Sequence, residues 1–360
     1  MIFEKIHTVP TSDELIDKAF RRAARAKAGK TVRDRDGAMK AHESMIMTSG
    51  NILSDNLANT VRRFPNFDDL SDFYYELTDI VVGIDDLRIA LGSADWASNK
   101  IHEISREYVG KIRKSKDPVK TRKEAFGRMS SVIGSISKHL IFLNEARNIM
   151  RKFPDVREEP TIVVAGYPNV GKSSFVAMVT GAKPEIASYP FTTKGVLIGH
   201  FERNHDRYQV IDTPGLLDRP MSERNEVELQ AITAIKHLDA VVLFILDASE
   251  TCGYEIADQK RLLDEVVANF EMPVYVVANK CDHDLFKIPD FVDVKMSTAT
   301  GENLDSIVDR LVEMIEETKN EKEAKEAAEE AARELSEEMA EEAAKLSEEL
   351  GEELDKADLK

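Results

Sequence analysis

A stretch near the middle of the chain has the spacing of a phosphate-binding loop. Residues 166–173 read GYPNVGKS, which fits the pattern G-x-x-x-x-G-K-[ST], and they lie between the apolar run 161–165 and a helical pattern. Such glycines let backbone N–H groups turn into one concavity, which holds a β-phosphate at a helix N-terminus. We expect Lys172 to contact the β- and γ-phosphates and the Ser173 hydroxyl to bind Mg²⁺. A glycine-rich turn without a ligand is the alternative, and the strand and helix on either side favour the nucleotide.

Two further segments fit loops that sense the γ-phosphate. Residues 189–194 read YPFTTK and precede a β-type run, and we choose Thr193 over Thr192 as the threonine that binds magnesium. Residues 212–215 read DTPG at the end of another run. Asp212 would hold magnesium through water, and the Gly215 N–H would contact the γ-phosphate, so loss of that phosphate releases both loops. The predicted catalytic residues are Lys172, Thr193 and Gly215, and the predicted metal ligands are Ser173, Thr193, Asp212 and, for potassium, Asn169.

A third motif selects the base. Residues 279–282 read NKCD and close the apolar run 274–278. The Asp282 carboxylate can accept two hydrogen bonds from guanine, from N1–H and the N2 amino group, and adenine offers no such donor pair. Residues 296–300 (MSTAT) follow the last predicted strand and would add backbone contacts, so the expected ligands are GTP and GDP. The predicted nucleotide contacts are Gly166, Pro168, Asn169, Val170, Gly171, Lys172, Ser173, Ser174, Thr193, Asp212, Gly215, Asn279, Lys280, Asp282, Ser297, Thr298 and Ala299.

The residue that follows this DTPG motif bears on catalysis. It is Leu216, where many small GTPases carry the glutamine that orients water. Hydrolysis is therefore expected to be slow or to be completed by another group. Our hypothesis is that Asn169 holds K⁺ near the phosphates as a fixed positive charge, and the alternative is that Asn169 only caps the loop.

The surrounding pattern predicts how these motifs are positioned. From residue 161 onward β-type and helical stretches alternate, which indicates an α/β domain with a largely parallel sheet. Residues 1–153 are helical throughout, with segments near 36–63, 69–82, 84–115 and 117–152 after an N-terminal helix, and predict a helical bundle. The proposed division is 1–153 for the bundle, 154–160 for a linker, 161–318 for the GTPase domain and 319–360 for an acidic helix. In that last segment apolar residues recur at 4-4-3 spacing, which predicts a nearly straight helix.

Charge is distributed unevenly along the 360 residues. The net charge is −17, yet residues 1–160 contain 28 Lys and Arg against 24 Asp and Glu. The basic residues form two clusters, Arg21, Arg22, Arg25, Lys27, Lys30, Arg33 and Arg35, and Lys111, Arg113, Lys114, Lys116, Lys120, Arg122 and Lys123. Each is either a solvated surface or a contact for an RNA phosphate backbone. The aromatic residues at 64, 67 and 73–75 could stack on bases, although their helical spacing favours a buried core.

The cysteine content and the length of the apolar runs indicate the cellular compartment. The two cysteines, Cys252 and Cys281, lack metal-ligand spacing and suggest a reducing environment. No apolar run approaches the roughly 18 residues that span a bilayer. We therefore expect a cytoplasmic protein without a membrane partner, and we expect no DNA. The acidic helix is either a solvated surface or an element that folds onto the basic domain and competes with RNA.

These motifs together resemble the nucleolar GTP-binding protein (Nog) family, in the Obg and HflX-like branch of translation-factor-related GTPases. The resemblance rests on residues 166–174, 191–194, 211–218, 228–234, 246–253 and 277–282, and on 3–6, 9–10, 87–92 and 125–129 of the helical part. It implies a P-loop GTPase domain preceded by an all-α bundle, and a factor in assembly of the large ribosomal subunit that binds pre-ribosomal RNA. The eukaryotic pattern has a long basic C-terminal extension where this chain has its acidic helix, so the chain looks more like an archaeal short form.

The sequence leads to one functional prediction and two alternatives. The prediction is a GTP-hydrolysing switch whose helical domain docks on ribosomal RNA of the large subunit or its precursor. The first alternative is a regulatory module in which GTP controls a protein partner. The second is an accessory GTPase in RNA or tRNA modification.

Overall fold

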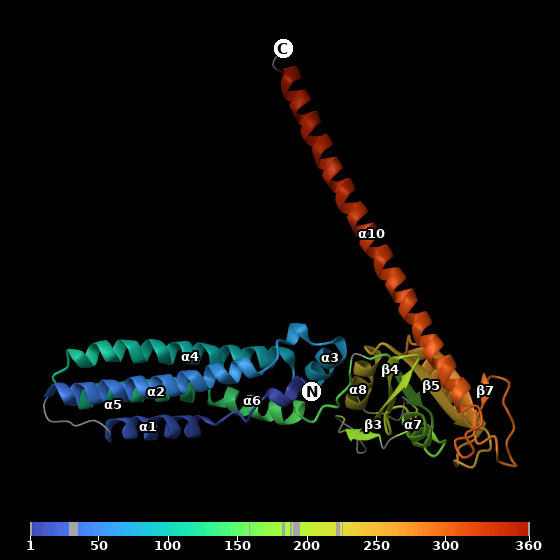
Figure 1. The fold of residues 1–360 in the computed structure, drawn as a ribbon. Helices are drawn as coiled ribbons and strands as arrows, with labels where there is room; N and C mark the ends of the chain where they lie inside the picture. Colours follow the sequence, from blue (N-terminus) through green and yellow to red (C-terminus); the bar gives the residue numbers. More distant parts are fainter. Residues whose placement is uncertain are drawn as a thin grey trace.

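The chain folds into an elongated helical part, a compact part built on a sheet, and a long projecting helix (Figure 1). The computed structural model describes residues 2–28, 35–157, 159–181, 184–187, 189, 195–220, 224 and 226–358. This order of a helical domain, a mostly parallel sheet and a C-terminal helix confirms the predicted fold class. No helix among these residues has the length and apolar character that crossing a bilayer requires.

The helical part is a bundle that runs away from the sheet domain (Figure 1). Its helices are α1 (Ser12–Ala28), α2 (Arg35–Arg63), α3 (Asp72–Val81), α4 (Ile84–Arg113), α5 (Pro118–Ser135) and α6 (Ser137–Met150), with 3-10 turns at Ile2–Lys5 and Phe67–Asp69. The helices α2 and α4 pack along each other through fully buried side chains such as Leu53, Leu57 and Ile101. Phe20 of α1 stacks on Phe126 of α5 with ring centroids 4.2 Å apart, which fixes α1 against α5.

One predicted helix is divided in the structure. The segment 117–152 was expected to be continuous, but α5 ends at Ser135, and Ile136 has φ −102° and ψ 8°, outside the helical region. Ile133, Ile136 and Leu140 are all buried. The apolar spacing therefore continues across the break, which is why the pattern alone did not reveal it.

The sheet domain begins after the linker. Its strands are β1 (Thr161–Ala165), β2 (Glu185–Ala187), β3 (Val196–Arg203), β4 (Asp206–Asp212), β5 (Ala240–Asp247), β6 (Val274–Asn279) and β7 (Val294–Lys295). They lie in the order β2-β3-β4-β1-β5-β6-β7, and only the pairs β2–β3 and β3–β4 are antiparallel. Its helices are α7 (Lys172–Thr180), α8 (Glu226–Lys236), α9 (Ile256–Asn269) and the first turns of α10 (Leu304–Asp358). All five residues of β1 and all eight of β5 are buried, as expected of central strands in a sheet covered on both faces.

The parallel strands bring the motifs to one edge. In the pairing register Val164 of β1 lies opposite Asp212 of β4, and Asp247 of β5 lies opposite Asn279 of β6. Ligands of open α/β sheets bind outside the carboxyl ends of the strands, where the strand order reverses. The phosphate-binding loop follows β1 at that position.

The two parts of the chain are joined by the linker and by a contact between helices. The Tyr74 hydroxyl of α3 hydrogen-bonds Pro154 O (2.8 Å) and Val156 O (3.0 Å) and accepts a bond from the Val156 N–H (2.9 Å). In addition, α3 packs against α8, the helix that follows the DTPG motif. The projecting helix α10 is anchored through buried Ile307 and Leu311, and its distal part stands clear of both domains (Figure 1).

Candidate nucleotide site

The phosphate-binding loop has the backbone that its glycines predict. Gly166 has φ 131° and Gly171 has φ 109°, values that favour glycine. A Cβ on Gly171 would lie 2.1 Å from the Asn279 amide nitrogen, so the loop can approach β6 only without a side chain there. The Lys172 ammonium is buried in the loop and donates to Gly166 O (2.7 Å) and Tyr167 O (2.8 Å). It is therefore held inside the concavity of the loop, where we predict the phosphate contacts.

The predicted magnesium ligands come together below this loop. Ser173 Oγ donates to Asp212 Oδ2 at 2.7 Å, although the two residues are 39 positions apart. Asp212 is fully buried, and its Oδ1 has no hydrogen-bond partner among the residues that the structure describes. Burial raises the pKa of Asp212, and Lys172 and Ser173 oppose this by stabilising the carboxylate. A buried carboxylate oxygen without a partner beside a hydroxyl is a donor set that fits Mg²⁺. The third predicted ligand, Thr193, lies outside the described residues.

The loop after Asp212 is tied to the phosphate-binding loop. The Gly166 N–H donates to Leu217 O at 2.9 Å, and the Gly215 N–H donates to Asp218 Oδ2 at 2.8 Å. Gly215 has φ 88°. Leu216 is fully buried, so its side chain cannot contact a water molecule beside a phosphate.

Asn279 joins three segments on the base side. Its amide nitrogen donates to Val170 O (2.7 Å) and to Thr298 Oγ1 (3.0 Å), and its carbonyl oxygen accepts from the Thr298 N–H (2.9 Å). Both Asn279 and Ser297 are fully buried. Asn279 therefore aligns the phosphate-binding loop with the segment expected beside the base.

Asp282 is exposed, and one of its carboxylate oxygens accepts a hydrogen bond from another side chain of the protein. Its Oδ1 accepts from Ser297 Oγ at 2.5 Å, and the Ser297 oxygen accepts from the N–H groups of Ala299 and Thr300, each at 3.1 Å. The hydrogen bond from Ser297 lowers the pKa of Asp282. The carboxylate is thus ionised and oriented, as the recognition of two guanine donors requires.

Asn169 and its neighbours complete the predicted set. Asn169 has a left-handed backbone (φ 64°), its side chain is exposed, and it makes no side-chain hydrogen bond within the described part of the chain. This geometry does not support a capping role for its amide. Pro168 is half-buried, and Ser174 is exposed at the start of α7.

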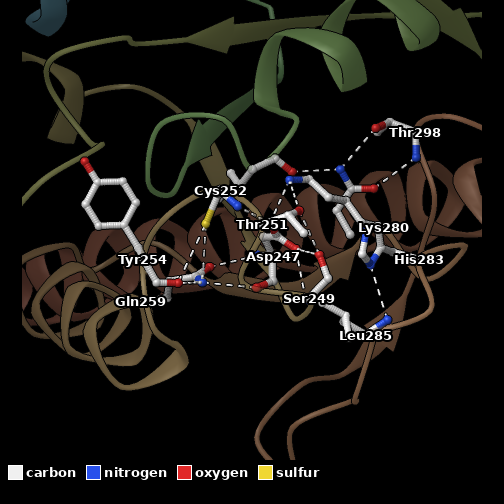
Figure 2. A network of polar contacts seen from close by, with 12 residues as sticks. Asp247, Ser249, Thr251, Cys252, Tyr254, Gln259, Lys280, His283, Leu285 and Thr298 are labelled. Carbon is white, nitrogen blue, oxygen red and sulfur yellow. Dashed lines mark hydrogen bonds and ion pairs between the residues drawn. The ribbon is translucent and has the colours of Figure 1, made fainter.

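A buried carboxylate that the motif analysis did not assign organises the loop between β5 and α9 (Figure 2). Asp247 is fully buried; its Oδ2 accepts from Lys280 Nζ (2.7 Å), the Cys252 N–H (2.7 Å) and Thr251 Oγ1 (3.0 Å). Its Oδ1 accepts from both the N–H and the hydroxyl of Ser249. Burial of the carboxyl opposes ionisation, but these hydrogen bonds outweigh it and lower the pKa of Asp247 to about 2.

This network fixes Lys280 of the NKCD motif. Its ammonium also donates to Thr251 Oγ1 at 2.9 Å, and Gln259 of α9 locks the same loop by donating to Asp247 O and Tyr254 O. Tyr254 in turn packs on Tyr167 of the phosphate-binding loop, with ring centroids 4.2 Å apart. The β5–α9 loop therefore connects the base side to the phosphate side. The sequence clue was the polar run 247–251 directly after a buried strand.

Comparisons with known proteins place the chain in a family. Residues 3–157 match the NOG1 N-terminal helical domain, and residues 226–282 match nucleolar GTP-binding protein 1 (NOG1). An uncharacterized protein of Methanocaldococcus jannaschii is 41% identical over 286 residues, which cover 78% of this chain and 81% of that protein. Nucleolar GTP-binding protein 1 of Arabidopsis thaliana is 37% identical over 290 residues, 78% of this chain and 43% of the relative.

Two further relatives extend the comparison. Nucleolar GTP-binding protein 1 of Encephalitozoon cuniculi is 36% identical, with 72% of this chain and 52% of the relative covered. The chain thus spans about half or less of these eukaryotic relatives. A crystal structure of a putative nucleolar GTP-binding protein 1 from Plasmodium falciparum aligns with a TM-score of 0.43 and 32% identity, covering 47% of this chain and 93% of that one. This chain belongs to the nucleolar GTP-binding protein 1 family, a family of GTP-binding proteins with a P-loop GTPase domain.

Proposed function

We propose that this protein is a GTP-hydrolysing switch in assembly of the large ribosomal subunit, and that its helical domain docks on ribosomal RNA. The observation that carries the proposal is the position of the two basic clusters. The second cluster spans the end of α4 and the start of α5, at the end of the bundle farthest from the sheet (Figure 1). Of the first cluster, Arg21, Arg22, Arg25 and Lys27 lie on α1, which the Phe20–Phe126 stack holds against α5. Cations that are distant in sequence thus gather towards one end of the domain.

Several of these cations are not used within the protein. Lys111 pairs with Glu107, Arg113 with Glu43 and Arg21 with Asp17. Among the described residues the remaining exposed cationic side chains of the two clusters make no ion pair; they are Arg22, Arg25, Lys114, Lys116, Lys120 and Lys123. Arg122 is instead used within the bundle, where it contacts His42, Met45 and the Phe126 ring. Unpaired cations favour contact with phosphates, because their charge is available to replace counterions.

The packing of α3 against α8 supports a link between docking and nucleotide state. The DTPG loop and α8 are consecutive, so a rearrangement around Gly215 reaches α3 through one helix contact. A ligand shifts the equilibrium between two conformations of a protein only if it makes different contacts in each of them. The γ-phosphate provides that difference at the Gly215 N–H.

Hydrolysis requires the same residues in an oriented arrangement. Lys172 would hold the β- and γ-phosphates, Gly215 would donate to the γ-phosphate, and Ser173 with Asp212 would hold Mg²⁺, which neutralises developing negative charge when bound. Thr193 is the proposed third ligand. Because Leu216 is buried, we propose a slow reaction in which Asn169 holds K⁺ beside the phosphates.

The deciding experiment is co-sedimentation with large ribosomal subunits from the same organism. The full chain is mixed with subunits in the presence of GDP, of a non-hydrolysable GTP analogue, or of neither. We expect nucleotide-dependent association, and we expect Lys114→Glu/Lys116→Glu/Lys120→Glu to weaken it at low salt. Absence of association in all three states would instead favour a protein partner or an RNA-modification partner.

The ion requirement is tested separately. Turnover of GTP in potassium chloride should exceed turnover in sodium chloride, and Asn169→Ala should remove the difference while leaving GDP affinity within a few-fold. Equal rates in both salts would remove the potassium hypothesis. Lys172→Ala should abolish binding of both nucleotides, and retained micromolar affinity would contradict the phosphate-binding assignment.

A further inference from the structure

A basic cavity lies where the helical domain meets the linker, outside both basic clusters. It has a volume of about 800 Å³, and its walls come from the first 3-10 turn, the end of α2, α3 and the linker. The lining residues are Ile2, Lys5, Arg62, Arg63, Phe64, Pro65, Tyr74, Asp155, Val156 and Arg157. Sites for small ligands span about 300 to 1,000 Å³, so the cavity is large enough for a nucleotide unit.

The cations of this cavity outnumber the acids that could neutralise them. Lys5 and Arg63 are exposed and make no side-chain hydrogen bond or ion pair within the described residues. Arg62 donates to Ala58 O and to the Asn59 side chain, both uncharged groups. Within the described residues, Arg157 is the lining cation that pairs with carboxylates, at 3.5 Å from Glu159 and 4.0 Å from Asp155. The other three lining cations have no ion pair in that part of the chain.

The position of the arginines in α2 does not account for this concentration of charge. Arg62 and Arg63 occupy the last turn of α2, where cations complement the helix dipole. Lys5 and Arg157 come from other segments, 57 and 95 positions away from Arg62 in sequence, and the fold brings them to the same cavity. Convergence of cations from three segments is a property of the tertiary structure.

Apart from Asp155, the remaining lining is mostly apolar. Phe64, Tyr74 and Val156 are buried, whereas Ile2 is 44% exposed and Pro65 is half-buried. Pro65 ends α2, and the Tyr74 hydroxyl fixes the backbone of Val156. The cavity thus offers a preformed apolar surface bordered by cations. An unpaired base can pack on Ile2 and Pro65 while its flanking phosphates contact Lys5 and Arg63.

We propose that this cavity binds an unpaired segment of RNA, and so forms a second RNA contact next to the linker. The inference rests on the proposed RNA-docking function and adds a site to it. Single-stranded RNA fits because its bases turn outward and its phosphates follow at short intervals, whereas the bases of a duplex are stacked inside and cannot enter a cavity. An acidic peptide shares the charge but provides no flat apolar group between its charges.

The test measures binding of a fluorescein-labelled uridine 12-mer to the full chain by anisotropy at several potassium chloride concentrations. The cavity variant is Lys5→Glu/Arg63→Glu. The matched control is Arg106→Glu/Lys138→Glu, an equal charge change at two exposed residues of the same domain without ion pairs in the described structure. All four side chains are exposed, and unchanged GDP affinity and circular dichroism will establish that the variants are folded.

We expect the cavity variant to bind the 12-mer about tenfold more weakly and the control to change by less than threefold. Each lost phosphate contact lowers the salt slope of single-strand binding by about 0.7, so the cavity variant should lose about 1.4. A duplex of the same length should not distinguish the cavity variant from the control.

Three outcomes would overturn the proposal. One is equal affinity of the cavity variant and the parent while Lys114→Glu/Lys116→Glu/Lys120→Glu loses affinity, which would leave RNA docking intact and place it at the distal end alone. Another is polyglutamate binding as tightly as the 12-mer with the same dependence on Lys5 and Arg63, which would assign the cavity to an acidic protein. Failure of all variants to change RNA binding would remove the RNA-docking function as well.

Discussion

The Asp218 carboxylate accepts a hydrogen bond from the N–H of Gly215, the group that we predict to contact a γ-phosphate. The two anions cannot use the same donor at once, and the turn that brings Asp218 back is fixed by the bond from the Gly166 N–H to Leu217 O. A side chain of the protein thus occupies the predicted γ-phosphate contact in this conformation. We expect binding of GTP, and not of GDP, to displace it.

Removing Asp218 should therefore favour GTP over GDP. Asp218→Ala is expected to bind a non-hydrolysable GTP analogue about three- to tenfold more tightly relative to GDP, about 0.7 to 1.4 kcal/mol. Asp218→Asn keeps an acceptor oxygen without the charge, so its preference for the GTP analogue over GDP should lie between those of the parent and Asp218→Ala. Titration with fluorescent nucleotides measures both affinities. The control is Asp284→Ala, an exposed carboxylate after the NKCD motif, and an equal change for both nucleotides would contradict the competition.

Changing Asp282 should alter the base that is recognised. Asp282→Asn is expected to move preference from guanine towards xanthine, in which the N2 amino group is replaced by a carbonyl. Ser297→Ala removes the 2.5 Å hydrogen bond that orients the carboxylate. It should weaken binding of GDP and of xanthosine diphosphate by a similar factor without a change in preference. Competition assays with both diphosphates separate the two effects, and unaltered selectivity of the Asn variant would refute direct recognition.

The buried Asp247 predicts a pH dependence of stability. Its pKa in the fold is about 2, below the ordinary 3.8, so its stabilising contribution is complete above pH 3.8 and is lost as the pH falls through 2. Asp247→Asn should lower stability at pH 7 by on the order of 1 to 2 kcal/mol, because Lys280 loses its counter-charge. Urea unfolding of both proteins at pH 7, 5 and 3 should give a difference that shrinks only at the lowest pH. A constant difference would mean that ionisation of Asp247 does not contribute.

The Tyr74 hydroxyl should stabilise the linker. Burial, and secondarily Asp155, raises the pKa of Tyr74, so the phenol keeps the proton that it donates. Tyr74→Phe leaves buried linker groups without their partner and is expected to cost about 1 to 3 kcal/mol. Thermal unfolding measures this, and trypsin should cleave faster at Arg157. Tyr75→Phe is the matched control, since the neighbouring ring is half-buried and makes no side-chain hydrogen bond in the described structure.

The strands that carry the motifs were predictable because their signals are local. Residues 240–246 are an unbroken apolar run that ends at Asp247, and the structure has β5 over Ala240–Asp247. The NKCD motif ends β6, as its position after the run 274–278 predicted. The interpretation of Phe64, Phe67 and Phe73 as core residues is also confirmed, since each is less than a tenth exposed.

Other features depend on tertiary contacts that no single motif encodes. Asp247 acquires its role only when β5 lies beside β6 and Lys280 comes within 2.7 Å. The contact between Gly215 and Asp218 requires a left-handed backbone at Gly215. The spacing of apolar residues in the sequence does not reveal the turn that brings the two residues together. The cavity around Lys5 and Arg63 requires the packing of three segments. Thr193 lies outside the described residues, and its role stays a prediction.

The side-by-side packing of α2 and α4 has a mechanical consequence. Helices of 29 and 30 residues are each about 45 Å long, and together they form a stiff arm that extends from the domain junction. A rotation of about 5° where α3 meets α8 would displace the far end of such an arm by about 4 Å, from its length. A small rotation at the domain junction thus becomes a displacement of the distal end that exceeds the length of a hydrogen bond. The bundle therefore amplifies a rotation at the contact between α3 and α8, because its far end lies a long way from that contact.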